Sequence, residues 1–340
     1  MLRYIIIGAG AIGGAVGGRL TQYGHRCVLV GRGEHLAAMQ AEGLRVRSPE
    51  GDLTLEVTAV GGPAEVELTL DDVLVVATKT HQADAALAAW TDRPVFAQGS
   101  IVGTAGDRLP VLMALNGVAS EQMALRYFSR VFGVCVWMPA VHLVPGEVII
   151  RGEPWSGVFH IGRVPPSPDD EPDGRLLDEL ERDWTSSQLS VTRPAEVMPW
   201  KYRKLISNIG NVFQALVGPG GGSGPLVAAA EGEARMILDR AGIGYTSDEE
   251  ESAARADGFT IKPVAGEPAE LGGSTWQSLT RGTGNVETDY LNGEIAQIAH
   301  SHGLTAPINA GVASAARLAA ARGQKPGAVT ADELAELLNL

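Results

Sequence analysis

Residues 4–20 read YIIIGAGAIGGAVGGRL, and this stretch decides how the first half of the chain folds. An apolar run with the length of a buried strand is followed by a glycine-rich turn and then by a helical segment. The pattern GxGxxG is met by Gly8, Gly10 and Gly13. Strand, glycine turn and helix in this order are the context in which the motif binds the pyrophosphate of a dinucleotide.

Each glycine of the motif has its own physical reason. Gly8 permits the tight turn, Gly10 lets the backbone approach the pyrophosphate without a Cβ atom in the way, and Gly13 lets the helix pack closely on the sheet. The helix start, with Ala11 and Ile12, presents free N–H groups and a partial positive charge to the phosphates. The alternative is a glycine-rich helix start without a ligand, which the flanking strand and helix disfavour. We therefore expect a dinucleotide at this turn.

Arg32 follows the second predicted strand, RCVLV at residues 26–30, at a position that discriminates between dinucleotides. Where the ligand is NAD, an acidic residue here binds the ribose hydroxyls. An arginine instead offers the 2′-phosphate of NADP charge-assisted hydrogen bonds, worth about 1.5 to 3 kcal/mol. An exposed loop arginine without a ligand is the alternative. We expect NADP, used as NADPH.

The rest of the chain divides into a region with strands and a helical region. Short apolar runs alternate with helical segments up to about residue 117, which predicts a parallel sheet covered by helices on both faces. From Phe132 onward, β-branched and aromatic residues around a Pro-Gly turn predict appended antiparallel strands. After Arg193 helical periodicity dominates to the end. The expected fold class is α/β, with a Rossmann-type doubly wound sheet in a domain at 1–192 and an all-α domain at 193–340.

The composition argues against several classes of protein. With 340 residues, 45% of them hydrophobic and 20% charged, the chain is an ordinary globular protein of two-domain length. A formal net charge of −13 argues against a nucleic-acid partner, because phosphate backbones would be repelled. Cys27 and Cys135 are too few for a disulfide framework or a zinc site. No apolar stretch reaches the roughly 20 residues that span a bilayer, so we expect a cytoplasmic protein without metal or membrane contact.

Polar residues follow two further predicted strands, at the edge where ligands bind in open parallel sheets. Lys79 comes after DVLVVAT, Gln82 lies a turn later, and Asn116 follows VLMAL. Each also has an ordinary explanation, because a lysine at a helix start is commonly solvated and Asn-Gly is a common turn. The residues alone leave both interpretations open.

The segment PWKYRKLISNIGNVFQALVG at residues 199–218 reads as a helix with one apolar face. On another face Lys201, Lys204, Asn208 and Asn211 recur at spacings of three, four and three. Solvent is the usual surrounding of such a polar stripe, and a cleft is the alternative. Periodicity does not choose between the two.

Two more polar residues lie near predicted helix starts. Ser274 begins STWQSL, and Glu287 lies in VETDYL. An acid in the first turn of a helix is already favoured by the helix dipole, so the pattern alone gives Glu287 a structural role.

Taken together, these segments resemble the ketopantoate reductase (2-dehydropantoate 2-reductase) family of NADPH-dependent, two-domain enzymes of pantothenate synthesis. The likeness covers nearly the whole chain. It rests on GAGAIG with Arg32, ATKTHQ (77–82), LNG (115–117), WKYRKLISN (200–208), STWQSL (274–279) and VETDYLNGEIAQIAHSHGLTAPIN (286–309). The last two segments carry most of the specificity, because the glycine motif alone would fit many oxidoreductases.

The resemblance implies roles for the polar residues. Lys204 would hydrogen-bond the ketone oxygen and act as general acid, with Asn116 and Asn208 orienting the lysine and the substrate. Ser274 would bind the carboxylate side of the substrate, and Glu287 would accept a hydrogen bond from a substrate hydroxyl. The remaining implied contacts are Asn211 at the substrate and Lys79, Gln82 and Asn116 at the cofactor.

The chain departs from the family pattern at several positions. Val212 stands where a second asparagine of the helix is expected, and Leu115 stands where some members have a histidine. The stretch between Ser274 and Glu287 looks one residue longer, and the middle segment around the acidic loop is also longer. These departures leave the reaction type intact and the substrate open. Ketopantoate, another 2-oxo acid or ketone, and no substrate at all in a silent NADP(H)-binding regulator are the alternatives, and a homodimer is one of the oligomeric states left open.

Overall fold

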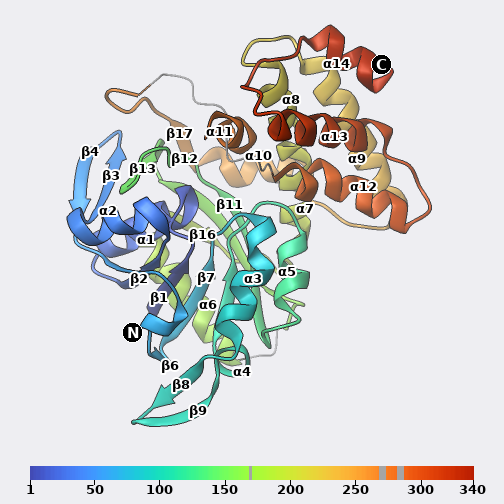
Figure 1. Ribbon diagram of the computed structural model, residues 1–340. Coiled ribbons are helices and arrows are strands. Elements are labelled where there is room, and N and C mark those ends of the chain that lie inside the picture. Colours follow the sequence, from blue (N-terminus) through green and yellow to red (C-terminus); the bar gives the residue numbers. More distant parts are fainter. Residues whose placement is uncertain (168–170, 268–272, 282–286) are drawn as a thin grey trace. The chain divides into compact units, whose positions relative to one another are not determined.

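The computed structural model describes residues 1–167, 171–267, 273–281 and 287–340 (Figure 1). The chain forms two compact units. The sheet unit comprises Met1–Leu115, Ser120–Trp200 and Asp248–Ala269, and the helical unit comprises Asn116–Ala119, Lys201–Ser247 and Glu270–Leu340. The domain boundary between residues 192 and 193 stays a prediction.

An eight-stranded sheet forms the core of the sheet unit, in the order β16-β15-β11-β10-β7-β1-β2-β5. Its strands are β1 (Arg3–Ile7), β2 (Arg26–Val30), β5 (Thr58–Val60), β7 (Asp72–Val76), β10 (Pro110–Met113), β11 (Arg130–Trp137), β15 (Gly157–Val164) and β16 (Leu189–Thr192). The six neighbouring strands β11, β10, β7, β1, β2 and β5 pair in parallel. Strand β15 is antiparallel to β11, and β16 is parallel to β15. The predicted Rossmann-type sheet with appended antiparallel pairing is confirmed.

Alternate residues of a strand point to opposite sides of the sheet, and consecutive residues of β1 and β7 are buried, so both faces of this sheet are covered. The helices of this region are α1 (Ala11–Gln22), α2 (Gly33–Glu42), α3 (Thr80–Thr91), α4 (Ala105–Arg108), α5 (Ala119–Ala124), α6 (Glu171–Thr185) and α10 (Asp248–Ala256). In β1, Ile6 joins the apolar cluster that contains Val16 of α1. Its neighbour Ile7 joins the cluster that contains Leu87 of α3. Two apolar cores therefore fix the sheet from its two sides.

A second sheet, with the strand order β12-β13-β3-β4, packs against one side of helix α1 (Figure 1). Its strands are β3 (Leu44–Ser48), β4 (Gly51–Leu55), β12 (Ala140–Val141) and β13 (Glu147–Ile150). A Cβ on Gly14 would lie 2.7 Å from Cγ1 of Val148, and one on Gly18 would lie 2.8 Å from Cγ2 of Val46. The opposite side of α1 packs on β1 and β2. Glycines four residues apart thus let a second sheet, which the sequence analysis did not predict, approach the helix.

The shorter strands of the sheet unit lie outside these two sheets. A third sheet has the order β6-β8-β9, with β6 (Leu68–Thr69), β8 (Pro94–Ala97) and β9 (Ser100–Thr104), and η1 (Pro63–Glu65) is a short 3-10 helix. Strand β14 (Gly152–Pro154) pairs with β17 (Phe259–Ile261). The region of β17 was predicted to be helical. Its strand depends on a partner more than one hundred residues away, which local periodicity does not reveal.

The helical unit is built mainly from helices of the second half of the chain. They are α7 (Met198–Asn208), α8 (Gly210–Val217), α9 (Gly224–Arg240), α11 (Ser274–Arg281), α12 (Asn292–Ser301), α13 (Pro307–Ala321) and α14 (Ala331–Leu338), with η2 (Glu287–Tyr290) as a 3-10 helix. Along the chain, α10 and β17, which belong to the sheet unit, lie between α9 and α11. Helix α13 contacts α8, α9, α12 and α14, so it lies at the centre of the unit. None of the helices in the described part of the chain is long and apolar enough to cross a membrane.

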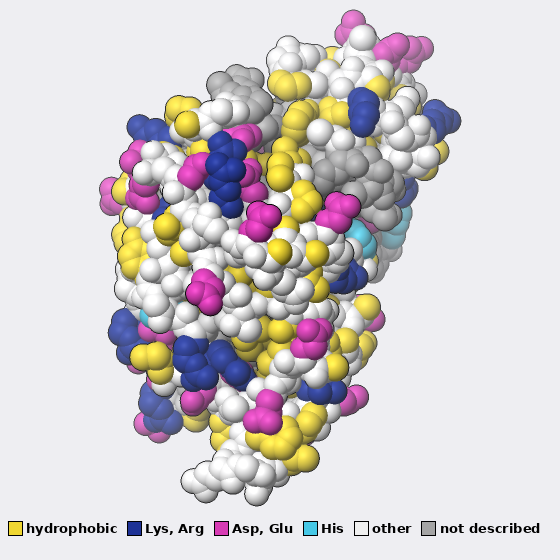
Figure 2. All heavy atoms as spheres, turned by 60° about the vertical axis from the view of Figure 1, so that its left-hand side comes forward, with side chains coloured by type: hydrophobic (Ala, Val, Ile, Leu, Met, Phe, Trp, Pro, Cys, Tyr) yellow, Lys and Arg dark blue, Asp and Glu magenta, His cyan; other side chains and the backbone are white. Residues whose placement is uncertain are grey.

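Acidic and basic side chains are mixed on the surface. Figure 2 shows one face of the molecule, on which Lys and Arg side chains lie among Asp and Glu side chains. On β3, Arg45 pairs with Asp52 at 2.6 Å and with Glu147 at 3.1 Å. Basic residues of this sheet are therefore already engaged by carboxylates.

Candidate functional site

The glycine turn connects β1 to α1 at the carboxyl edge of the main sheet. Gly8 has a φ of +100°, and a Cβ there would lie 2.9 Å from the backbone nitrogen of Thr78. A Cβ on Gly13 would lie 2.1 Å from the carbonyl oxygen of Gly8. The fold itself therefore requires glycine at both positions.

Gly10 differs from these two glycines, because its side-chain position is open. Among the described residues, no heavy atom beyond its own chain neighbours lies within 4 Å of a Cβ built there. Gly10 is the N-cap of α1, and no described side chain caps this helix. Ala11 and Ile12 in the first turn are half-buried. Open space and uncapped backbone N–H groups fit the pyrophosphate of a dinucleotide.

Three loops leave the sheet side by side at this edge. Strand β1 lies between β2 and β7, and Ile7 is in register with both Val30 and Val76. Because these three parallel strands end at the same level, the glycine turn, the loop after β2 and the loop after β7 begin together. This edge at the ends of neighbouring parallel strands is where open α/β sheets bind their ligands.

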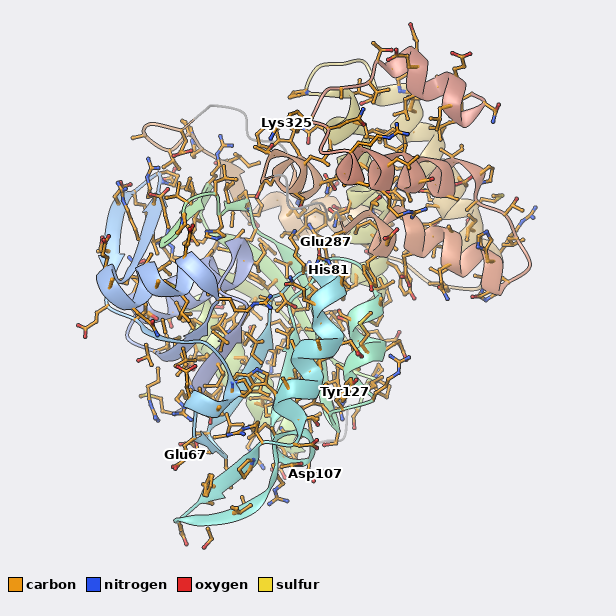
Figure 3. The ribbon with its side chains drawn as sticks, in the orientation of Figure 1. Glu67, His81, Asp107, Tyr127, Glu287 and Lys325 are labelled. Carbon is orange, nitrogen blue, oxygen red and sulfur yellow. The ribbon has the colours of Figure 1, made fainter. Side chains whose placement is uncertain are left out.

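The other predicted cofactor residues of the sheet unit lie on these loops. Arg32 is exposed and forms the N-cap of α2, directly after β2. Lys79 is half-buried and forms the N-cap of α3, where the backbone N–H of Gln82 donates to its carbonyl oxygen at 2.8 Å. His81, which Figure 3 labels, is exposed in the first turn of the same helix. The structure thus gathers the predicted cofactor residues of the sheet unit at one edge. Asn116, which was also predicted at the cofactor, belongs to the helical unit, and the roles of all these residues stay predictions.

A chain of side-chain amides links three of the predicted site residues in the helical unit. Nδ2 of Asn208 donates to Oδ1 of Asn116 at 3.3 Å. Nδ2 of Asn211 donates to Oδ1 of Asn208 at 3.4 Å. Asn208, 8% exposed, is the central member. Its amide is therefore held between two hydrogen-bond partners, one on each side.

Lys204 lies on α7, four residues before Asn208, and residues at this spacing share one helix face. Lys204 is half-buried, and Lys201, one turn earlier, is only 2% exposed. A polar stripe on a helix usually faces solvent, and this one does not. The two sequence interpretations are separated here by burial and not by periodicity.

The segment predicted as one helix is broken at Ile209, between α7 and α8. The N–H of Ile209 donates to the carbonyl of Ile206 at 3.2 Å, a tighter connection than the α-helical one. A Cβ on Gly210 would lie 3.2 Å from Cγ1 of Val227, so α9 packs closely at the break. Asn208 thus ends one helix, and Asn211 lies in the first turn of the next.

Glu287 is 7% exposed and begins η2, a 3-10 helix instead of the predicted α-helix (Figure 3). The Asn116-Gly117 turn rests against this element. Gly117 has a φ of +80°, and a Cβ there would lie 2.6 Å from the carbonyl oxygen of Tyr290. The helical unit therefore brings the loop of Asn116 to the same helix that carries Glu287.

Ser274 is the first residue of α11. The preceding Gly273 donates its N–H to Oε1 of Gln214 at 3.0 Å, and a Cβ on Gly273 would lie 2.9 Å from Oδ1 of Asn211. The start of α11 is thus seated on the polar residues of α8. Gln214 was not among the predicted site residues, although it lies three residues after Asn211.

A second layer of buried polar residues lies behind the helix break. Nδ2 of Asn292 donates to the carbonyl of Ile209 at 3.4 Å and to Oδ1 of Asn309 at 3.0 Å. Nδ2 of Asn309 donates to Glu233 at 2.8 Å and to the carbonyl of Ala230 at 3.0 Å. The sequence analysis assigned no role to Asn292 or Asn309. Asn292 begins α12 and Asn309 lies in the first turn of α13, positions at which asparagine is common, so local pattern gave no reason to single them out.

The departures from the family pattern have unequal structural outcomes. Val212 is 1% exposed and Leu115 is 3% exposed, so both are packing residues here. The segment that looks longer between Ser274 and Glu287 includes 282–286, and the acidic loop includes 168–170. These residues lie outside the described part of the chain.

The fold and the polar cluster define a class of enzyme. A dinucleotide turn on a doubly wound sheet, and a lysine on the helix face that holds side-chain amides, are the parts of a nicotinamide-dependent carbonyl reductase. The family model "Ketopantoate reductase PanE/ApbA" matches residues 4–166, and that of its C-terminal part matches residues 196–320. The chain belongs to this family of NADP-dependent oxidoreductases, and the predicted resemblance is confirmed.

Relatives and solved structures match nearly the whole chain. The 2-dehydropantoate 2-reductase of Pyrococcus horikoshii is 26% identical over 319 residues, which cover 91% of this chain and 94% of the relative. The enzyme of that name from Halobacterium salinarum is 25% identical, with 94% and 99% covered. A solved ketopantoate reductase from Ralstonia eutropha has a TM-score of 0.73 at 23% identity, and covers 95% of this chain and 99% of its own. D-mandelate dehydrogenase, solved with NADH and anilino(oxo)acetate, has a TM-score of 0.74 at 19% identity and the same coverage, so it shares the fold.

Proposed function

We propose that the protein uses NADPH to reduce a small 2-oxo acid, and that its substrate is 2-dehydropantoate (ketopantoate), which becomes pantoate. The observation that carries the proposal is the amide chain through Asn208, on the buried helix face that also holds Lys204. Family membership supports the reaction class. The relatives from Pyrococcus horikoshii and Halobacterium salinarum, which are named for 2-dehydropantoate, support the substrate.

The cofactor would lie along the carboxyl edge of the sheet unit. Gly10 leaves room for the pyrophosphate, and the uncapped start of α1 supplies N–H donors. Arg32, exposed directly after β2, would pair with the 2′-phosphate, which supports NADPH over NADH. When bound, NADPH supplies the hydride that the carbonyl carbon of the substrate receives.

Lys204 would act on the carbonyl oxygen. As the carbonyl carbon is reduced, negative charge develops on the oxygen, and an ammonium group placed there stabilises that charge. Nζ of Lys204 would then transfer a proton to the oxygen and complete the alcohol. General acid catalysis of this kind contributes about a hundred- to ten-thousandfold to the rate.

The asparagines would hold the lysine and the substrate in position. Asn208 lies one turn after Lys204, and its amide is held in place between Asn116 and Asn211. A donor whose direction is already set loses little conformational freedom when the substrate binds. Asn116 and Asn208 are therefore proposed to orient the ketone, and Asn211 to line the substrate pocket.

Ser274 and Glu287 would determine the substrate specificity. Ketopantoate differs from a simple 2-oxo acid by its hydroxymethyl group, and Glu287 is a buried acceptor for that hydroxyl. A site that hydrogen-bonds a substrate hydroxyl favours that substrate over an analogue that lacks the hydroxyl. Ser274, at the start of α11, would bind the carboxylate side.

A substrate panel tests the proposal. Purified protein is mixed with NADPH and with either ketopantoate or 3,3-dimethyl-2-oxobutanoate, which lacks only the hydroxyl, and NADPH oxidation is followed by absorbance. We expect turnover of ketopantoate with a kcat/KM at least about a hundredfold higher than that of the analogue. No turnover of ketopantoate, together with turnover of other ketones, would contradict the substrate and keep the reaction class.

Lys204 variants test the mechanism. Lys204→Ala should bind NADPH normally and lose about a hundred- to ten-thousandfold in kcat. Lys204→Arg keeps the positive charge, but a guanidinium does not release its proton, so the difference between the two variants separates charge stabilisation from proton transfer. Lys325→Ala, at an exposed lysine of the helical unit labelled in Figure 3, is the matched control. An unchanged rate in Lys204→Ala would remove the assignment.

A second candidate substrate is a bulkier 2-oxo acid or ketone. The family pattern offers polar residues where this chain has Val212 and Leu115, and these departures leave the substrate open, although both side chains are packing residues here. A phenyl-substituted 2-oxo acid in the panel distinguishes the two. If no carbonyl compound is reduced although NADPH binds, the protein is instead a silent NADP(H)-binding regulator.

A further inference from the structure

His35 connects the dinucleotide turn to a distant hairpin of the sheet unit. It lies in the first turn of α2, and its Nε2 is 2.7 Å from the carbonyl oxygen of Ala9, between the first two glycines of the motif. On the other side of the ring, the backbone N–H of Gly146 donates to Nδ1 at 2.8 Å. One side chain thus joins three segments that are far apart in the sequence.

These two contacts fix the tautomer of His35. The N–H of Gly146 can only donate, so Nδ1 must be the acceptor. Nε2 therefore carries the proton and donates to Ala9. Burial and the nearby His142 lower the pKa of His35, which agrees with a neutral ring. Both nitrogens of the neutral ring are satisfied, so the side chain holds a single orientation.

The hairpin side of the contact is closely packed. The ring of His142 packs against that of His35, with centroids 4.2 Å apart, and Nδ1 of His142 lies 2.9 Å from the carbonyl oxygen of Glu147. Gly146 has a φ of +78°, and a Cβ there would lie 2.9 Å from Cβ of Ala38 on α2. The turn before β13 is therefore pressed directly against α2, and His35 is held from both sides.

On the other side, the ring controls one peptide of the glycine turn. The N–H of Ala9 donates to the carbonyl of Val30 at 3.0 Å, and the carbonyl of Ala9 accepts from His35. That carbonyl and the N–H of Gly10 belong to the same planar peptide unit, in which the two groups point in opposite directions. The contact from His35 therefore turns the Gly10 N–H away from α2.

We propose that His35 is a positioning residue for the dinucleotide: by holding the Ala9 carbonyl, it sets the direction of the Gly10 amide that the pyrophosphate meets. This inference rests on the proposed use of NADPH at the glycine turn. His35 acts through the backbone of Ala9, so its loss should weaken cofactor binding more than it slows the chemical step.

The test compares NADPH binding and steady-state kinetics in His35→Ala, His35→Gln and wild type. We expect the Kd for NADPH to rise about tenfold or more in His35→Ala, the effect of losing one buried hydrogen bond, while kcat at saturating NADPH changes less than about threefold. His35→Gln should recover most of the affinity, because its amide can donate to Ala9 and accept from Gly146. If His35→Ala does not fold, His35→Leu, which preserves the apolar volume, takes its place.

His25→Ala is the matched control. His25 is a half-buried histidine of the same unit. It directly precedes β2, at the end of the strand that is farther from the glycine turn, and its Nε2 lies 3.4 Å from Oγ of Ser186. The His25→Ala variant should bind NADPH with the affinity of the wild type. A Kd in His35→Ala within about twofold of wild type, or a glutamine no better than alanine, overturns the inference. Failure of wild type itself to bind NADPH would instead overturn the proposed cofactor, so the two failures are distinguishable.

Discussion

The open position at Gly10 leads to a prediction that separates cofactor binding from folding. Gly10 has φ −73° and ψ −153°, a backbone conformation that alanine also adopts, and no described heavy atom beyond its chain neighbours would contact the added Cβ within 4 Å. Gly10→Ala should therefore leave the free energy of unfolding unchanged or raise it by about 0.4 to 1 kcal/mol, because the unfolded chain loses conformational freedom.

NADPH binding should respond in the opposite way. The added methyl group would occupy the space through which the pyrophosphate approaches the backbone, and forcing one extra methyl into a packed contact costs about 1 to 3 kcal/mol. This cost corresponds to a loss of affinity of about five- to 150-fold. Fluorescence titration with NADPH measures the affinity, and urea unfolding followed by tryptophan fluorescence measures the stability.

Two further glycines calibrate the result. In Gly13→Ala the Cβ would lie 2.1 Å from the carbonyl oxygen of Gly8, so this variant should lose about 3 kcal/mol or more of stability before any effect on NADPH is considered. In Gly174→Ala, within α6, the Cβ also meets open space among the described residues, and NADPH affinity should not change. If Gly10→Ala binds NADPH as tightly as Gly174→Ala does, the dinucleotide does not approach this turn and the reasoning is refuted.

Three other changes give separate readouts. Arg32→Glu should lower the preference for NADPH over NADH by about ten- to a hundredfold, measured as the ratio of kcat/KM values with the two cofactors. Arg26→Glu, at the opposite end of β2, should leave this ratio unchanged. An unaltered ratio in Arg32→Glu would contradict a contact with the 2′-phosphate. Glu287→Gln should narrow the difference in kcat/KM between ketopantoate and its analogue without the hydroxyl, and an unchanged ratio would count against that contact. Burial lowers the pKa of His160 to about 4, so the folded protein binds fewer protons than the unfolded chain below pH 6.5, and roughly 3 kcal/mol of stability should be lost as the pH falls from 6.5 towards 4. Urea midpoints across this range should fall less steeply in His160→Phe, and parallel slopes would refute the assignment.

The main sheet could be predicted because its signals are local. Buried parallel strands read as short apolar runs, and the turn after β1 requires glycine for reasons that act within a few residues. The sheet of β12, β13, β3 and β4 could not be predicted in this way, because β13 pairs with β3 across about one hundred residues and register is a long-range property. Its trace in the sequence was Gly14 and Gly18, to which the sequence analysis assigned no role. Paired glycines four residues apart on a buried helix can indicate that another layer packs there.

The sequence could predict which residues form the candidate site, but not whether they are buried. Periodicity placed Lys204 and Asn208 on one face, but only contacts from distant segments decide that this face is buried. Another contact from a distant segment lies at the helix break at Ile209. A carbonyl released by a break inside an apolar core needs a new donor, and Asn292 supplies one from α12. Asn208 and Asn211 flank this break, and Asn292 lies 83 residues after Ile209 along the chain, so no short window of sequence contains both the amide chain and the side chain that satisfies the break.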